Sequence, residues 1–382
     1  MRVSKFAKVA SIALAFGIVA STPAHAADLQ GSGASFPALL IEACKAPFAS
    51  ATTHSFTYAS SGSGTGQANS DKSIGDFWMS DGAYTASTKR ASLIHVPLVA
   101  APIALLHNLP SKTPLQLSAA TVAGIFSGKI TKWNDPAIVA DNNRAIQEVI
   151  YKKDSKGNVI KNKAGKPEVL REVTRNIRYT LPPQNIKVIY RSDSSGTTGA
   201  FTAALNGAAP EVWTKPGNNA FGSTFPGKLN DKANLGRISG FSGSAAVAAA
   251  AAKTRYSVTY AESAYAKDNG LAIASIKNEA GNWQAPTSGG VSAFLGAAKV
   301  ADNGIVTFDY KTKDPGSYLF GTTSYALVDT KQKDAETAKA VRDLLSYLLD
   351  PKCPQTDPKQ DFTTITGKLR DINLKLIARI GN

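Results

Sequence analysis

The feature that most constrains the fold is a turn rich in hydroxyl groups that joins a strand pattern to a helix pattern. It runs from Arg191 to Gly199, follows the apolar run 186–190 and precedes the helix-like run 200–205. Backbone N–H groups at a helix start lack partners and lie at the positive end of the helix dipole. Arg191 adds a planar fork that suits two oxygens of a tetrahedral oxyanion. The turn predicts an anion site, although a serine-capped helix beside a surface arginine fits this segment equally well.

The same pattern occurs twice more, nearer the N-terminus. Residues 31–37 precede an apolar run, with Pro37 suited to the first turn of a helix and Ser35 suited to its cap. A strand-like run at 55–58 leads into a second Gly/Ser loop at 59–66. Each loop alone is more often a plain turn, but three such loops before helices suit convergence on one oxyanion. Glycines let backbone N–H groups approach such a ligand without a Cβ in the way.

At this level of detail the chain resembles the phosphate-binding proteins of bacterial phosphate ABC transporters, which are periplasmic solute-binding proteins. The segments that match the motifs of that family are Gly31–Pro37, Gly62–Gly64, Ser80–Asp81, Gly128–Asp135, Leu181–Ile186, Arg191–Thr197 and Ala264–Lys267. The similarity extends from Leu29 to about Ile276 and fades towards the C-terminus. The resemblance implies an α/β, two-lobed periplasmic-binding-protein fold, similar to type II, with the ligand in the cleft between the lobes.

The resemblance also implies a set of phosphate ligands. They are Ser35, Phe36 (through its backbone N–H), Ser63, Asp81, Arg191, Ser195, Gly196 and Thr197, with Asp193 bracing Arg191. In this assignment the ionised Asp81 accepts a hydrogen bond from the O–H that phosphate keeps near neutral pH, and it repels fully deprotonated sulfate. By sequence alone, a turn residue before Gly82 is the favoured interpretation of Asp81. The chain departs from the family at Phe77–Met79, before Asp81, and at Gly64, where the family has serine.

The lobes are expected to be discontinuous along the chain. The apolar run Ile94–Leu106 predicts a buried strand that crosses between them, and a second crossing is expected near Tyr256–Tyr260. Lobe one is then expected to hold residues 28–105 and 261–382, and lobe two residues 106–260. The chain has 382 residues, a length that suits two lobes better than one core.

A segment absent from the family pattern lies at about 141–178. It holds ten basic and five acidic residues, with turn signals at Lys156–Asn158 and Ala164–Lys166. These signals predict one or two exposed hairpins. A solvated surface is the favoured interpretation, and a dedicated partner site is the alternative.

The first residues have the pattern of a secretory signal peptide. Basic residues precede an apolar run at 9–20, and the small residues Ala24–Ala26 offer a cleavage site before Ala27. Residues 1–26 are therefore expected to direct export to the periplasm, and no later segment is apolar for long enough to span a bilayer. The formal charge of +15, or +12 without this segment, attracts anions. It does not indicate nucleic acid, since no base-reading helix or RNP-type motif is present.

Cys44 and Cys353 are the two cysteines of the chain, and an exported compartment permits them to pair. We expect a disulfide, with two unpaired thiols as the alternative. Redox catalysis is not indicated, because there is no C-x-x-C motif.

No enzyme chemistry is evident. His54, His95 and His107 are not spaced like metal ligands, and no histidine accompanies a G-x-S-x-G turn. The run 244–252 predicts a helix capped by Ser242 or Ser244 whose role is packing. We therefore expect a monomeric receptor, without cofactor or metal, that delivers phosphate to a membrane ABC permease. The alternatives are a scavenging or adhesion protein and, less favoured, a secreted phosphatase.

Overall fold

The computed structural model describes residues 26–86, 89–110, 114–353 and 362–381. The expected signal peptide, apart from its last residue, lies outside the described residues. Within them, no helix is both long and apolar enough to cross a membrane.

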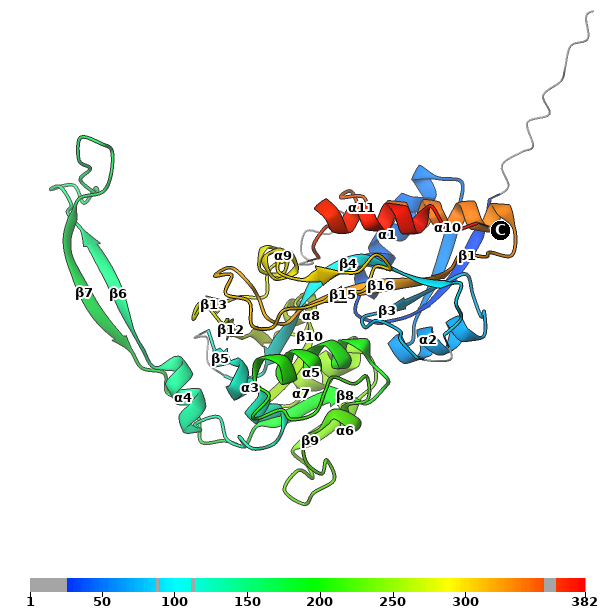
Figure 1. The fold of residues 1–382 in the computed structure, drawn as a ribbon. Helices are drawn as coiled ribbons and strands as arrows, with labels where there is room; N and C mark the ends of the chain where they lie inside the picture. The colour runs from blue at the N-terminus through cyan, green and yellow to red at the C-terminus, as the bar shows by residue number, and fades with distance from the viewer. Residues whose placement is uncertain (1–25, 87–88, 111–113, 354–361, 382) are drawn as a thin grey trace, which may run out of the picture.

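A nine-stranded mixed sheet organises the chain (Figure 1). Along the sheet the strands are β2 (Ser55–Ser60), β1 (Asp28–Gly33), β3 (Phe77–Ser80), β16 (Gly321–Asp329), β4 (Leu93–His107), β10 (Ser257–Glu262), β8 (Lys187–Arg191) and β9 (Ile238–Phe241), and β11 (Ala272–Ile273) also pairs with β4. Strands β1, β2 and β3 are mutually parallel, and so are β8, β9 and β10. The two parallel groups are joined through β16 and β4, which pair antiparallel with their neighbours.

Strand β4 runs through the middle of this sheet. All fifteen of its residues are buried, which confirms the buried strand that the apolar run predicts. It pairs with β16 along residues 93–102 and then with β10 along residues 103–107. One sheet thus passes through both segments that the sequence assigns to different lobes, and the lobe boundaries stay a prediction.

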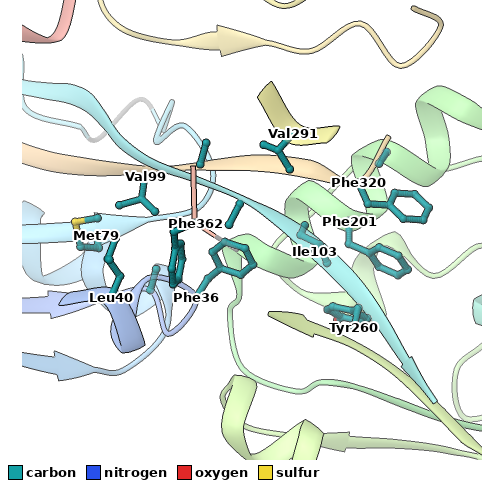
Figure 2. Packing of buried hydrophobic residues seen from close by; sticks show 14 of the residues in the cluster. Phe36, Leu40, Met79, Val99, Ile103, Phe201, Tyr260, Val291, Phe320 and Phe362 are labelled. Atoms are coloured by element: carbon teal, nitrogen blue, oxygen red, sulfur yellow. The ribbon is translucent and has the colours of Figure 1, made fainter. Parts of the chain in front are cut away.

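Helices pack around the strands. They are α1 (Ala38–Ala51), α2 (Ser63–Asp71), α3 (Ala119–Phe126), α4 (Pro136–Asn142), α5 (Gly196–Ala208), α6 (Phe221–Thr224), α7 (Ser244–Lys253), α8 (Ala264–Asp268), α9 (Ser288–Gly296), α10 (Ala335–Leu348) and α11 (Gly367–Ile377). Figure 2 shows apolar side chains arrayed along β4, from Leu40 and Met79 at one end to Phe201 and Phe320 at the other. One large apolar cluster therefore extends along both groups of parallel strands.

Smaller strands lie outside the main sheet. They are β5 (Gln116–Ser118), β12 (Ser275–Lys277) and β13 (Trp283–Gln284) in a three-stranded sheet, β14 (Lys299–Val300) with β15 (Val306–Thr307), and β6 (Arg144–Tyr151) with β7 (Val169–Ile177). Strands β6 and β7 form an antiparallel ribbon that projects away from the rest of the chain (Figure 1). The added segment thus forms the exposed hairpin that its turn signals predict.

A disulfide joins the first helix to the C-terminal region. Cys44 of α1 and Cys353, which follows α10, are bonded, with their Cα atoms 5.4 Å apart. Both cysteines are fully buried. The expected pairing is confirmed, and it links residues 309 positions apart in sequence.

Candidate functional site

The predicted site residues lie where the parallel strands end. Strand β1 ends at Gly33, just before Ser35, while β2 leads into Ser63 and β3 into Asp81. Because these strands are parallel, their carboxyl ends meet at one edge of the sheet, the edge at which open α/β sheets bind ligands. Strand β8 ends at Arg191, and α5 begins at Gly196. The structure brings these loops, which are far apart in sequence, into contact.

The contacts centre on Asp81. Its backbone N–H donates to Ser63 Oγ at 3.2 Å, and Thr197 Oγ1 donates to its Oδ2 at 2.9 Å. Ser324 Oγ of β16 donates to its Oδ1. Burial raises the pKa of Asp81 above its usual value, while the hydroxyl hydrogen bonds and the charge of Arg191 act in the opposite direction. This arrangement makes Asp81 a buried acceptor held by side chains from three separate segments.

Gly196 allows the two loops to approach so closely. A Cβ at this position would lie 2.5 Å from Ser63 Oγ and 2.8 Å from the backbone nitrogen of Asp81. Any side chain there would push the first turn of α5 away from the loop after β3. Ser195 completes this turn: it caps α5 by accepting the Thr198 N–H at 3.1 Å.

Arg191 lies at the carboxyl end of β8, in the second group of parallel strands, and is 1 % exposed. Its Nε and Nη2 donate to the two carboxylate oxygens of Asp193, at 2.7 and 2.5 Å, and its Nη1 donates to Ser244 Oγ at 3.1 Å. A guanidinium has five N–H donors, so two remain beyond these three bonds. The Asp193 pair and burial have opposite effects on the pKa of Arg191, and the net result is a raised value. Arg191 is therefore a fixed cation with donors to spare.

Ser35 does not cap α1, contrary to the expectation from its sequence position. The residue before α1 is Pro37, and no side chain caps that helix. The Ser35 hydroxyl instead accepts the Ser244 N–H at 3.3 Å and lies 3.2 Å from Ser244 Oγ. The ring of Phe36, which is fully buried, packs edge-on against Phe362 in the core. These contacts place the loop after β1 against Ser244, which also accepts a hydrogen bond from Arg191.

Besides Ser324, two further residues that sequence reasoning missed belong to the cluster. Ser244 was expected only to cap a packing helix, but it is the first residue of α7 and Gly243 takes the cap position. Its hydroxyl receives a bond from Arg191 and donates to Glu262 Oε1 at 3.1 Å. Glu262 is the last residue of β10, so the carboxyl ends of β8, β9 and β10 supply Arg191, Ser244 and Glu262 in turn. A lone carboxylate at the end of an apolar strand is the signal that could have singled out Glu262.

Glu262 is unusual because it is buried and only partly satisfied. Its side chain is 3 % exposed, and its Oε2 has no hydrogen-bond partner among the described residues. Burial raises the pKa of Glu262 to about 8; the nearby charge of Arg191 opposes the shift, and that of Asp81 adds to it. A buried carboxylate with a free oxygen is costly unless it is protonated or finds a further donor.

The described residues hold no group of three or more His, Cys, Asp or Glu side chains placed to bind a metal ion. The site is instead built from hydroxyls, helix N-termini, one guanidinium and carboxylates. Chemically, this set can donate hydrogen bonds to a small oxyanion and accept one from a protonated oxyanion.

Comparison with known proteins identifies the family of this chain. A family model described as a PBP superfamily domain matches residues 19–352. The phosphate-binding protein PstS of Pasteurella multocida is 30% identical, over 88% of this chain and 86% of that protein. The chain belongs to the PBP superfamily, in the family of PstS phosphate-binding proteins.

Other members of the family show the same likeness. The phosphate-binding protein PstS 3 of Mycobacterium tuberculosis is 30% identical over 75% of this chain and 69% of its own length. A solved structure of a high-affinity periplasmic phosphate-binding protein with bound phosphate has a TM-score of 0.63 at 21% identity, covering 92% of this chain and 93% of that one. This last likeness shows the α/β, two-lobed fold of the family, as the sequence predicts.

Proposed function

We propose that this chain is an exported receptor that captures inorganic phosphate between its two groups of parallel strands and delivers it to an ABC permease. The observation that carries the proposal is the buried cluster in which Arg191, from one group of parallel strands, lies with two spare donors near Asp81, from the other group. Its curated relatives are named for phosphate binding, and a neighbour of the same fold was solved with phosphate bound.

In this proposal each sequence-predicted residue has a defined task. Arg191 donates two hydrogen bonds to phosphate, and the N–H groups at the start of α5 and after β1 donate the others. Asp81 accepts the remaining phosphate O–H. The ligand set is Ser35, Phe36, Ser63, Asp81, Arg191, Ser195, Gly196 and Thr197, with Asp193 fixing the plane of the Arg191 fork.

The proposal makes this protein a receptor without a catalytic step. Its relatives are named as phosphate-binding proteins. We place the ligand between lobes formed by residues 28–105 with 261–382 and by residues 106–260, because both crossing strands, β4 and β10, lie between the two groups of ligands. The exported protein is proposed to act as a monomer in the periplasm.

Titration calorimetry of phosphate-free protein with phosphate and with sulfate tests this function. We expect one phosphate per chain, with a Kd at or below the micromolar range, which corresponds to about −8 kcal/mol. Sulfate should bind far more weakly, since it offers Asp81 no proton. The matched variant Asp81→Asn, whose amide can donate, should narrow the gap between the two anions. Equal affinities for phosphate and sulfate in the unaltered protein would overturn the assignment.

A further inference from the structure

The ribbon formed by β6 and β7 ends in a tip that the phosphate site does not use. We define the arm as residues 144–177 and its tip as residues 151–170. Figure 1 shows the arm projecting from α4 into solvent, with the tip at its far end. A two-stranded ribbon alone in water is only marginally stable, so an arm of this length calls for a partner or for local reinforcement.

The tip is reinforced by its own backbone. The Lys152 N–H donates to the carbonyl of Glu168, Glu168 N–H to that of Ile160, and Ile160 N–H to that of Lys152, at 2.8–2.9 Å. Two side chains close the turns: Asp154 accepts from the N–H groups of Lys156 and Asn158, and Asn162 closes the other turn in the same way. The tip is therefore a hairpin that its own hydrogen bonds stabilise.

The tip is also strongly cationic. It contains six lysines, two acidic residues and no arginine, whereas the arginines of the added segment lie outside the tip. Both carboxylates are already engaged, Asp154 in its turn and Glu168 in an ion pair with Lys152 at 3.0 Å. Among the described residues the other five lysines form no ion pair. Their charge is therefore available to an anionic partner.

Exposed apolar side chains accompany this charge. Of the ten large apolar side chains that are well exposed in the described part of the chain, five lie in the tip. They are Tyr151, Val159, Ile160, Val169 and Leu170, with Val169 48% and Leu170 58% exposed. Half of the exposed large apolar side chains thus fall within twenty consecutive positions. Exposed apolar residues gathered in this way indicate an interaction surface.

We propose that the arm tip binds the anionic surface of a lipid bilayer. Lysines attract anionic headgroups as mobile point charges, and aliphatic and tyrosine side chains enter the boundary between headgroups and acyl chains. A protein partner would favour arginine, whose fork pairs with carboxylates, and protein interfaces are depleted in lysine. The tip has the opposite composition. A second copy of this chain is disfavoured as the occupant, because the chain itself carries a formal charge of +15.

Vesicle flotation tests this proposal on the chain from Ala27 onwards. Vesicles that mix phosphatidylcholine with the anionic lipid phosphatidylglycerol are compared with vesicles of pure phosphatidylcholine. We expect binding to the anionic vesicles only, weakened as NaCl is raised because the charges are exposed. The absence of binding to anionic vesicles, or equal binding to both kinds, would overturn the proposal.

Matched variants separate the tip from the general charge of the chain. The tip variant combines Lys153→Gln, Lys156→Gln and Lys161→Gln, and its control combines Lys228→Gln, Lys232→Gln and Lys253→Gln at exposed positions of the body. The tip variant should lose on the order of a hundredfold in vesicle affinity, since each lysine near the surface contributes about a fivefold factor. The control should lose little. Equal losses in the two variants would overturn the proposal, because they would show that the overall positive charge of the chain, rather than the tip, accounts for vesicle binding.

A second pair tests the apolar contribution. Leu170→Ser in the tip should weaken vesicle binding, whereas Leu235→Ser, at a body position that is 66% exposed, should not. Thermal unfolding and phosphate titration of each variant verify that fold and phosphate site are intact, so this test succeeds or fails independently of the proposed function. Binding to soluble polyglutamate without binding to vesicles would overturn the lipid assignment and indicate an acidic protein partner.

Discussion

Replacing Glu262 by glutamine should change how the stability of this protein depends on pH. The side chain is buried, its Oε2 has no partner among the described residues, and burial raises its pKa to about 8. In the unfolded chain the same group titrates near 4.5. Between these two values the folded protein holds a proton that the unfolded chain has released. The free energy of unfolding of the unaltered protein therefore falls as pH rises through this window.

The expected magnitude follows from the size of the shift. One pKa unit corresponds to roughly 1.4 kcal/mol, so the contribution of Glu262 is fully present below about pH 4.5 and declines by up to that amount per pH unit. By about pH 8 the accumulated loss approaches 4–5 kcal/mol as an upper bound. Glu262→Gln has the same shape and no titrating proton, so it should lack this decline. Its stability relative to the unaltered protein should rise steadily from pH 5 to pH 8.

Urea denaturation at pH 5, 6, 7 and 8 measures this difference. The protein is first freed of phosphate, because a ligand that binds only the folded state adds stability of its own. Glu148→Gln, at an exposed position of β6, is the matched control and should leave the pH dependence unchanged. A constant offset between Glu262→Gln and the unaltered protein would refute the reasoning, since it would mean that Glu262 titrates alike in both states.

The remaining predictions concern the anion site and the disulfide. Arg191→Ala should weaken phosphate binding by about 2–5 kcal/mol, because it removes the spare donors and leaves Asp193 unpaired. Asp193→Ala should cost less, and calorimetry in which it costs more would contradict the proposed division of roles. The double variant Cys44→Ser, Cys353→Ser should lower the free energy of unfolding by about 2–5 kcal/mol and leave phosphate affinity unchanged. Unchanged urea midpoints would show that the bridge adds no stability.

Local patterns in the sequence were sufficient where neighbouring residues determine the outcome. The fifteen-residue strand β4 follows from an unbroken apolar run, and the hairpin arm follows from its turn residues. Arg191 and Asp193 are two positions apart, so their pairing needs only the local turn. The cysteine pairing followed from the even number of cysteines in a chain with an export signal, although nothing in the sequence indicates the distance between the two residues.

The order of the strands in the sheet decided which distant residues meet at the site. Arg191, Ser244 and Glu262 meet because β8, β9 and β10 are parallel neighbours whose carboxyl ends lie at one edge. Ser324 reaches Asp81 from β16, which lies more than two hundred residues further along the chain. No periodicity in one sequence encodes which strands become neighbours, since that depends on how apolar faces pack over the whole chain. The local pattern at Ser35 likewise fits a helix cap, but in the folded protein its hydroxyl contacts Ser244, the first residue of α7.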